Sequence, residues 1–155
     1  MMQRKAIVIA ANPNSPRVRD PDVGRLEPHI KHQKEYGAVF WDVFIAGLRD
    51  TQFKHPDIKV GYFYEVPKRA VEYKTDIEYI KRIKEIIDVR ERRFIPDCRR
   101  GYWDDVKQEP LVAVKIVKFH RLSRPYALNE FYLWSTANAL RRVQNYVIVR
   151  DPDYT

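Results

Sequence analysis

LVAVKIVKFHRLSRP, the stretch from Leu111 to Pro125, decides the fold that the sequence predicts. Along this stretch, residues at even positions point to one face of an extended strand and residues at odd positions to the other. Both sets are largely apolar as far as Val117, which predicts a central strand buried on both sides. From Lys118 onward the strand carries polar residues. Pro125 lacks a backbone N–H, so it limits continuation of the hydrogen-bond ladder between strands. The rest of the chain is therefore expected to pack on or beside this strand.

The length and charge of the chain set the next limits. Its 155 residues are enough for one domain, residues 1–155, with a core of its own. Lysine and arginine number 29 against 21 for aspartate and glutamate, which gives a net charge of +8. A positive balance of this kind favours polyanionic partners such as nucleic acid or an acidic membrane surface.

Cysteine usage and hydropathy indicate the compartment. Cys98 is the only cysteine in the sequence, so an intrachain disulfide and a cysteine-rich zinc site are both excluded. The apolar run near the N-terminus is too short for a signal peptide, and no segment approaches the roughly 18 apolar residues of a membrane span. We therefore expect a cytoplasmic protein with no membrane partner.

Turn residues and hydrophobic periodicity divide the remaining chain into short elements. The stretch 70–90 supports two interpretations. Alternate residues from Val71 to Tyr79 follow the period of a strand, whereas the isoleucines from Ile77 to Ile87 have helical spacing. We expect a strand that gives way to a helix within 76–90. The other expected elements are strands at Lys5–Ala10, Ala38–Val43, Lys59–Val66 and Asn145–Arg150, helices at Ile30–Tyr36 and in part of Leu128–Leu140, a weakly helical segment at 44–56, a proline-rich loop at 13–28 and an irregular segment at Arg90–Pro110.

This series of elements predicts the fold class. About six strands and a few short helices, often joined by connections too brief for right-handed crossovers, favour an α+β fold. Its expected form is a small mixed β-barrel flanked by short helices.

Several kinds of reactive site are missing from the sequence or only weakly indicated. The five glycines stand apart from one another, so there is no glycine-rich phosphate loop and nucleotide hydrolysis is not expected. His29 and His32 lie three residues apart beside lysines, where solvated histidines are commoner than metal ligands. We therefore predict no metal, no cofactor and no catalytic residue.

Aromatic residues carry the positive signal. The chain has three tryptophans, ten tyrosines and seven phenylalanines, interleaved with arginine and lysine. Aromatic faces next to cations are what a protein needs to stack an unpaired base and hold its phosphates. The alternative is that the tryptophans, Trp41, Trp103 and Trp134, all belong to the core.

The order of features over nearly the whole chain resembles the EVE and YTH-like branch of the PUA superfamily. The resemblance rests on a first strand ending in a small residue and asparagine, a Gly-x-x-x-Trp entry, a strand with glycine and aromatic residues, and a late strand that runs into a basic turn with proline. The Gly-to-Trp entry is one residue longer than in YTH domains. Here these motifs are Ala11 and Asn12, Gly37 to Trp41, Gly61 to Tyr64, and Val112 to Pro125, and the segment Leu140 to Asn145 resembles the one before the last strand of such domains.

The resemblance implies a PUA/EVE/YTH-like domain that reads a modified base, most of all N6-methyladenine, by flipping it into an aromatic cage. By position, Trp41 and Trp103 would form the two walls of the cage, and Asn12 would hydrogen-bond the base edge. The phosphate-binding residues would be Arg141 and Arg142. A flipped base offers two π-faces for stacking, and its methyl group adds apolar burial.

The family also implies partners. Domains of this kind stand at the N-termini of McrB-type restriction proteins, where they select methylated DNA for a separate AAA+ motor and a nuclease. The resemblance thus implies a non-enzymatic reader of methylated DNA in a modification-dependent restriction system. RNA is the alternative ligand, if the chain is a PUA-type RNA-binding module. A small ASCH-type hydrolase of modified nucleosides also stays open; it would need a poised lysine or carboxylate, for which Lys115, Glu72 and Asp104 are candidates.

Overall fold

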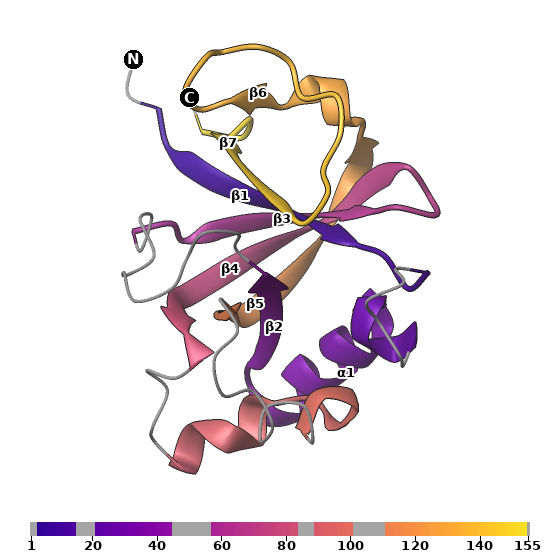
Figure 1. Ribbon diagram of the computed structural model, residues 1–155, viewed down its shortest axis with the longest axis vertical. Helices are drawn as coiled ribbons and strands as arrows, with labels where there is room; N and C mark the ends of the chain where they lie inside the picture. Colours follow the sequence, from indigo (N-terminus) through magenta and orange to yellow (C-terminus); the bar gives the residue numbers. More distant parts are fainter. Residues whose placement is uncertain (1–2, 15–20, 45–56, 84–88, 101–110, 155) are drawn as a thin grey trace.

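The computed structural model describes residues 3–14, 21–44, 57–83, 89–100 and 111–154. In this part of the chain, one α-helix and seven strands form an α+β fold (Figure 1), which confirms the predicted class. The strands build a single sheet in the order β2-β5-β4-β3-β1-β7-β6. They are β1 Lys5–Ala11, β2 Val39–Phe44, β3 Val60–Glu65, β4 Ala70–Arg82, β5 Leu111–Tyr126, β6 Tyr132–Leu133 and β7 Tyr146–Arg150; the helix is α1 Leu26–Tyr36, and the short 3-10 helices are η1 Pro21–Gly24, η3 Val89–Phe94, η4 Asp97–Arg99 and η5 Leu128–Glu130.

Strand β5, predicted to be a central strand, lies inside the sheet but next to its edge strand β2. It lies between β2 and β4 and is antiparallel to both. Val112 and Val114 belong to one core cluster and Ala113 to another, and all three side chains have 0% exposure. Both faces of the strand are therefore buried, as expected. The strand ends at Tyr126, one residue beyond Pro125.

The predicted change from strand to helix within 76–90 is wrong for residues 76–82, because β4 remains a strand to Arg82. Its register against β5 shifts between Asp76 and Ile77 and again between Ile77 and Tyr79. These irregularities let Ile77 and Ile80 pack in the same core cluster, although a regular strand would place residues three apart on opposite faces. The helical spacing of the isoleucines is thus produced by a bulged strand. Residues 84–88 lie outside the described part of the chain.

Helix α1 begins at Leu26, four residues earlier than predicted, and so includes the end of the expected 13–28 loop. Residues 21–24 of the same loop form η1. Pro28 falls in the first helical turn, where its missing N–H removes no hydrogen bond because those groups have no partner within the helix. The helix ends as predicted at Tyr36, and Gly37, with a φ of 92°, closes it.

The segment before the last strand contains less helix than expected. Within the predicted region Leu128–Leu140, the 3-10 turn Leu128–Glu130 is the helical part. The chain then adds β6 to the edge of the sheet and returns through 134–145 to β7. Phe131, Leu140 and Val143 pack against the sheet in one cluster. Irregular backbone with well-placed apolar side chains therefore covers this region in place of a longer helix.

The remaining strands lie close to their predicted positions. The bounds of β1, β2, β3 and β7 agree with the expected ones to within one residue. Among the described strands, β2 and β6 are the two edges of the sheet and do not pair with each other. The sheet is open in this part of the chain, so the predicted closed barrel is not confirmed. Residues 45–56 and 101–110, for which elements were also predicted, lie outside the described residues.

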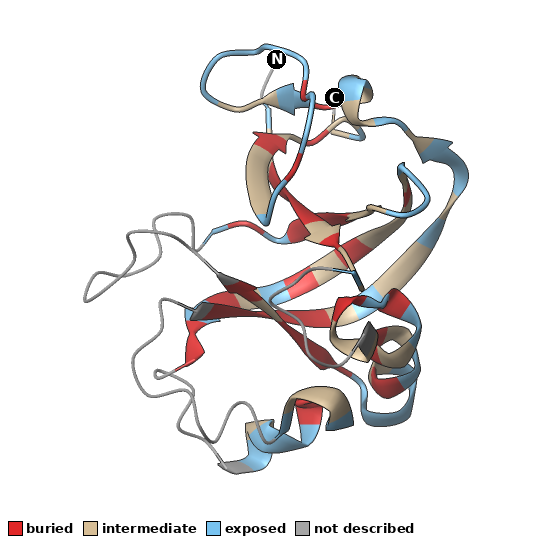
Figure 2. Cartoon of the chain, turned by 45° about the vertical axis from the view of Figure 1, so that its right-hand side comes forward, coloured by how far each residue is buried: buried red, intermediate tan, exposed pale blue. Residues whose placement is uncertain are grey.

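Different parts of the chain cover the two faces of the sheet. Helix α1 packs against β2 and β5, with Leu26 and Ile30 at one core cluster. Residues from 128 to 143 cover the other face through the cluster around Phe131. Figure 2 shows the buried residues concentrated along the crossing strands. No helix within the described ranges is long and apolar enough to cross a bilayer.

Candidate functional site

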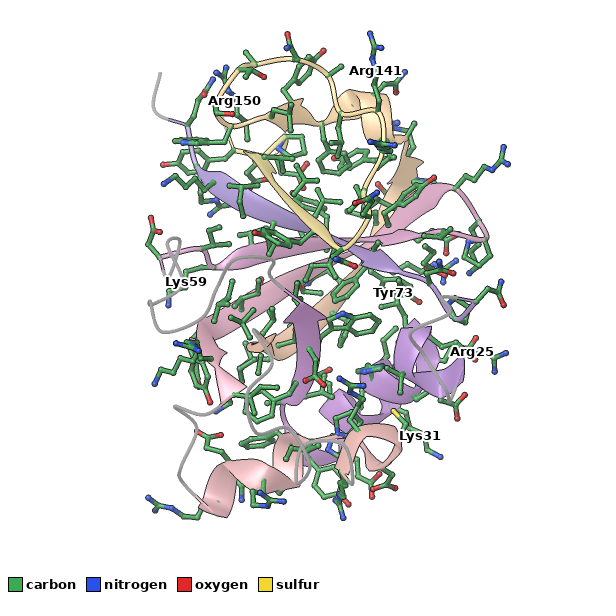
Figure 3. The ribbon with its side chains drawn as sticks, viewed as in Figure 1. Arg25, Lys31, Lys59, Tyr73, Arg141 and Arg150 are labelled. Atoms are coloured by element: carbon green, nitrogen blue, oxygen red, sulfur yellow. The ribbon has the colours of Figure 1, made fainter. Side chains whose placement is uncertain are left out.

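A cleft of about 300 Å³ lies where the end of β1 meets the first turn of α1. The turn between β3 and β4 forms another side, and Tyr73 on β4 and Arg121 on β5 complete it. In Figure 3, Tyr73 and Arg25 lie on the same side of the molecule. The apolar residues that line the cleft are Ala11, Pro13, Leu26, Ile30 and Pro67, and the charged ones are Arg25, Glu27, Glu65, Lys68 and Arg121.

The backbone holds the walls of the cleft close together. A β-carbon at Gly24 would lie 2.4 Å from the carbonyl oxygen of Asn12, so only glycine lets η1 pass this close to the end of β1. On the other side, the N–H of Val66 donates to the carbonyl oxygen of Ala11 at 3.0 Å. The Oδ1 of Asn12 accepts a hydrogen bond from the N–H of Asn14 at 3.0 Å, which turns the chain away from β1. The shape of the cleft is therefore set by main-chain contacts.

Tyr73 is the aromatic wall of the cleft, and Arg121 holds its ring in place. The guanidinium of Arg121 donates to the hydroxyl of Tyr73 at 3.1 Å, and its central carbon lies 5.6 Å from the ring centroid. Phe119 meets the same ring edge-on, with centroids 6.3 Å apart. Tyr73 is half-buried, whereas Arg121 is exposed. An oriented aromatic ring beside a guanidinium is suited to stack on a planar ligand.

The β3–β4 turn brings an ammonium group and a carboxylate into the cleft. The Nζ of Lys68 lies 3.3 Å from a carboxylate oxygen of Glu65 and 3.5 Å from one of Glu72. Its hydrogen bond to Glu65, and to a smaller extent Glu72, raises the pKa of Lys68, so this side chain is a cation at neutral pH. The Oε1 of Glu65 is buried and has no hydrogen-bond partner among the described residues. The cleft thus offers polar groups of both signs to a ligand.

The first turn of α1 borders the cleft with charged groups of both signs. Arg25 stands at the N-cap position, and within the described ranges no side-chain hydrogen bond caps the helix. Its ion pair with Asp22, at 3.4 Å, joins two side chains that are 56% and 50% exposed, so solvent screens it strongly. The N-terminal end of the helix dipole and the guanidinium of Arg25 attract an anionic ligand at this side, whereas the exposed carboxylate of Glu27 in the same turn opposes one.

His29 on α1 packs against Trp41 on β2. The Nδ1–H of His29 donates to the carbonyl oxygen of Arg25 at 2.7 Å, and the imidazole centroid lies 4.3 Å from that of Trp41. Trp41 is 5% exposed and meets Phe63 edge-on at 4.7 Å. Burial lowers the pKa of His29 to about 4, so the imidazole is neutral at physiological pH. These side chains fix α1 on the sheet.

The structure separates the residues predicted to contact a base and its phosphate. Asn12 lies between two residues that line the cleft, whereas Trp41 is not among the described lining residues. Trp103 lies outside the described residues. Arg141 and Arg142 are exposed between β6 and β7, and Figure 3 shows Arg141 near the top of the view, away from Tyr73. The roles assigned to these residues stay predictions.

Two lining residues, Tyr73 and Arg121, were missed as site residues in the sequence. Tyr73 was assigned only to the alternating pattern of its strand, and Arg121 to the polar end of the buried strand. Their pairing depends on the register of β4 against β5, in which Tyr73 is opposite Arg121. A sequence pattern does not supply that register.

Of the three residues named as hydrolase candidates, Lys115 has acidic partners that favour its charged form. Burial by itself would lower the pKa of Lys115, but its hydrogen bonds to Glu78 and Glu91 raise the pKa overall. Its Nζ lies 2.7 Å and 2.9 Å from carboxylate oxygens of these residues. Glu72 lies 3.5 Å from Lys68, and Asp104 is outside the described residues. A lysine that acts as a base needs a lowered pKa, which is the opposite of what these contacts produce.

The two helix histidines are both engaged with backbone groups. The Nε2–H of His32 donates to the carbonyl oxygen of Arg93 at 2.7 Å, and His29 donates to Arg25 as described above. Both rings are buried, contrary to the solvated positions expected for them. Within the described ranges, no three histidine, cysteine, aspartate or glutamate side chains gather as a metal site would require.

Comparison of the chain with known protein families, with curated proteins and with solved structures found no match.

Proposed function

We propose that the protein is a nucleic-acid-binding module that takes one unpaired or flipped base into the cleft. The observation that carries this proposal is the ring of Tyr73, oriented by the hydrogen bond from Arg121 at the mouth of the cleft. Stacking of a base on an aromatic side chain contributes about 1–3 kcal/mol of binding free energy. Arg121 adds a cation that can lie against the same base or meet the adjoining phosphate.

The size and lining of the cleft support a ligand of this kind. Its volume of about 300 Å³ is at the lower end of the range for small-molecule pockets, roughly 300–1,000 Å³. A site of this size suits a single planar base. Leu26, Ile30 and Pro67 provide apolar contacts, while Glu65 and the backbone near Asn12 provide hydrogen-bonding groups for a base edge.

The charges around the cleft support binding of the phosphate backbone. Arg25, Lys68 and Arg121 stand on three different elements around one opening. Arg25 pairs with Asp22 and Arg121 with Glu72, but both guanidinium groups are exposed to solvent. These pairs therefore neutralise the two arginines only in part. Together with the net charge of +8, these cations favour a polyanion over a free neutral base.

We further propose that the base is modified, with N6-methyladenine in DNA as the first candidate. This is in keeping with a PUA/EVE/YTH-like domain of a restriction system, in which a motor and a nuclease are supplied by other parts of the system. An apolar cleft wall gives a methyl group a place to be buried, which is worth about 0.8 kcal/mol, or about four-fold in affinity. Trp103 remains the second cage wall predicted from the resemblance. Trp41 is buried in the core.

The test is a set of fluorescence-anisotropy titrations at one fixed salt concentration, because phosphate contacts depend on salt. The ligands are matched DNA duplexes with adenine, N6-methyladenine, cytosine or 5-methylcytosine at one position. We expect a preference of about four-fold or more for one methylated duplex. Equal, salt-sensitive binding to all four duplexes would contradict recognition of a modified base. Tighter binding to a structured RNA than to DNA would assign the module to RNA. Turnover of free modified nucleosides would establish a hydrolase instead.

A further inference from the structure

One hydrogen-bond acceptor in the wall of the cleft is left without a donor. The Oε1 of Glu65, a lining residue, is buried and has no hydrogen-bond partner among the described residues. The other carboxylate oxygen, Oε2, lies 3.3 Å from the Nζ of Lys68. A carboxylate oxygen that is shielded from water and meets no donor costs stability in the free protein. A donor on a bound ligand would recover this free energy, so Oε1 marks a point at which the cleft can discriminate between ligands.

The main chain fixes the position of this carboxylate. Glu65 is the last residue of β3, and its carbonyl oxygen accepts the N–H of Lys68 at 3.1 Å and the N–H of Arg69 at 2.8 Å. Phe63 is directly opposite Tyr73 in the pairing of β3 with β4 and lies two residues before Glu65. Side chains two residues apart on a strand share a face. Glu65 therefore stands on the same face of the sheet as the ring of Tyr73, two residues farther along β3.

Glu65 and Lys68 together offer an acceptor beside a donor. The free carboxylate oxygen accepts a hydrogen bond, whereas an ammonium group only donates. Both residues line the cleft, and their charged groups lie side by side. The amino edge of adenine has the complementary pattern, because its exocyclic N–H donor stands next to a ring nitrogen that accepts. A base stacked on Tyr73 can therefore present this edge to the pair.

We infer that Glu65 selects the base by accepting an N–H of its exocyclic amino group, while Lys68 donates to the adjoining ring nitrogen; this inference rests on the proposed function. The ligand class is thereby narrowed to bases whose amino group keeps at least one N–H. Adenine, cytosine and N6-methyladenine meet this condition, because a single methyl group leaves one N–H in place. N6,N6-dimethyladenine has no such N–H, and purine lacks the amino group altogether. The site therefore tolerates a first methyl group on the amine and rejects a second.

Anisotropy titrations of four DNA duplexes at one fixed salt concentration test this inference. The duplexes carry adenine, N6-methyladenine, N6,N6-dimethyladenine or purine at one position. This position is opposite an abasic site in all four, because a lost base pair would itself make flipping easier. The variants are Glu65→Gln and, as a control of equal charge change, Glu72→Gln. Glu72 also lies beside Lys68, at 3.5 Å, but is not among the described lining residues of the cleft. Tyr73→Ala reports separately on stacking, and thermal unfolding by circular dichroism verifies that each variant is folded.

We expect the unmodified protein to bind the adenine and N6-methyladenine duplexes about ten-fold more tightly than the other two, as one hydrogen bond to a charged group would give. In Glu65→Gln the amide oxygen should face Lys68, since an ammonium group only donates, and this turns the amide N–H groups toward the amine of the base. The preference should therefore vanish in Glu65→Gln. Glu72→Gln should shift the affinity for all four duplexes by the same factor and so keep the preference.

Equal binding of all four duplexes by the unmodified protein would overturn the inference, and this comparison does not depend on the stability of any variant. A preference that survives in Glu65→Gln, or that is lost equally in Glu72→Gln, would overturn it as well. In each of these cases the cleft proposal stands if Tyr73→Ala still weakens binding. If Tyr73→Ala leaves the affinity for all four duplexes unchanged, or if none of them binds, the proposed function fails together with the inference.

Discussion

Acidification should destabilise the protein through one buried side chain, His29. Its exposed fraction is 2%, and its Nδ1–H donates to the carbonyl oxygen of Arg25 at 2.7 Å. Burial is the main reason that the pKa of His29 falls from 6.5 to about 4, and the nearby charge of Arg99 lowers it further. The folded protein therefore holds a neutral imidazole against Trp41 over a pH range in which an unfolded chain would protonate it.

The size of the effect follows from the two pKa values. The unfolded chain binds a proton at His29 near pH 6.5, and the folded protein binds it only near pH 4. The contribution of the neutral imidazole to stability is complete above pH 6.5 and is lost as the pH falls through this window. Each pH unit between the two values costs about 1.4 kcal/mol, so the whole window costs about 3 kcal/mol of unfolding free energy.

Urea unfolding followed by circular dichroism, near pH 7 and near pH 4, measures this loss. The matched variant is His29→Gln, whose side-chain amide still offers an N–H to the carbonyl of Arg25 but does not titrate. Carboxylates that titrate in the same range are common to both proteins, so the difference between them isolates His29. We expect the unmodified protein to lose about 3 kcal/mol more than the variant between the two pH values. Equal losses would refute the assignment of a buried, neutral imidazole.

Two substitutions test the framework of the site. Trp41→Ala should lower the free energy of unfolding by about 3–5 kcal/mol, because the side chain packs against His29 and Phe63. Chemical denaturation measures this loss. Unchanged stability together with lost ligand binding would instead support Trp41 as a cage wall. Gly24→Ala should both destabilise the protein and weaken ligand binding, because the new β-carbon would lie within 2.6 Å of three backbone atoms at the end of β1. Gly37→Ala is its control: nothing lies within 4 Å of that β-carbon, so only the cost of the left-handed φ, about 1–2 kcal/mol, is expected in a thermal melt. If both glycine variants bind ligand as well as the unmodified protein does, the close approach at Gly24 does not shape the site.

Much of the fold could be predicted because local patterns coincide with tertiary contacts. The two apolar faces of β5 identified a strand buried on both sides, and Gly37 marked the end of α1. The early start of α1 was missed because Pro28 looks like a loop residue, although proline is compatible with a first helical turn. The helix expected within 76–90 was an error of period for residues 76–82, since the bulges of β4 give isoleucines in a strand the spacing of a helix.

The candidate site was less predictable because it depends on contacts between distant segments. Aromatic and basic composition indicated the kind of ligand but did not identify the ring that faces it. Tyr73 and Arg121 are separated by 48 positions and meet only through strand pairing. Trp41, which seemed the better stacking residue, is drawn into the core by His29 and Phe63.

The most direct test of base binding in the cleft compares Tyr73→Ala and Tyr73→Phe with the unmodified protein, by anisotropy titration of the preferred oligonucleotide at fixed salt. The phenylalanine keeps the stacking face and loses only the hydroxyl that accepts from Arg121. We expect Tyr73→Ala to weaken binding by about 1–3 kcal/mol and Tyr73→Phe to weaken it by much less. Unchanged affinity in a folded Tyr73→Ala protein would contradict the central claim that a base stacks in this cleft.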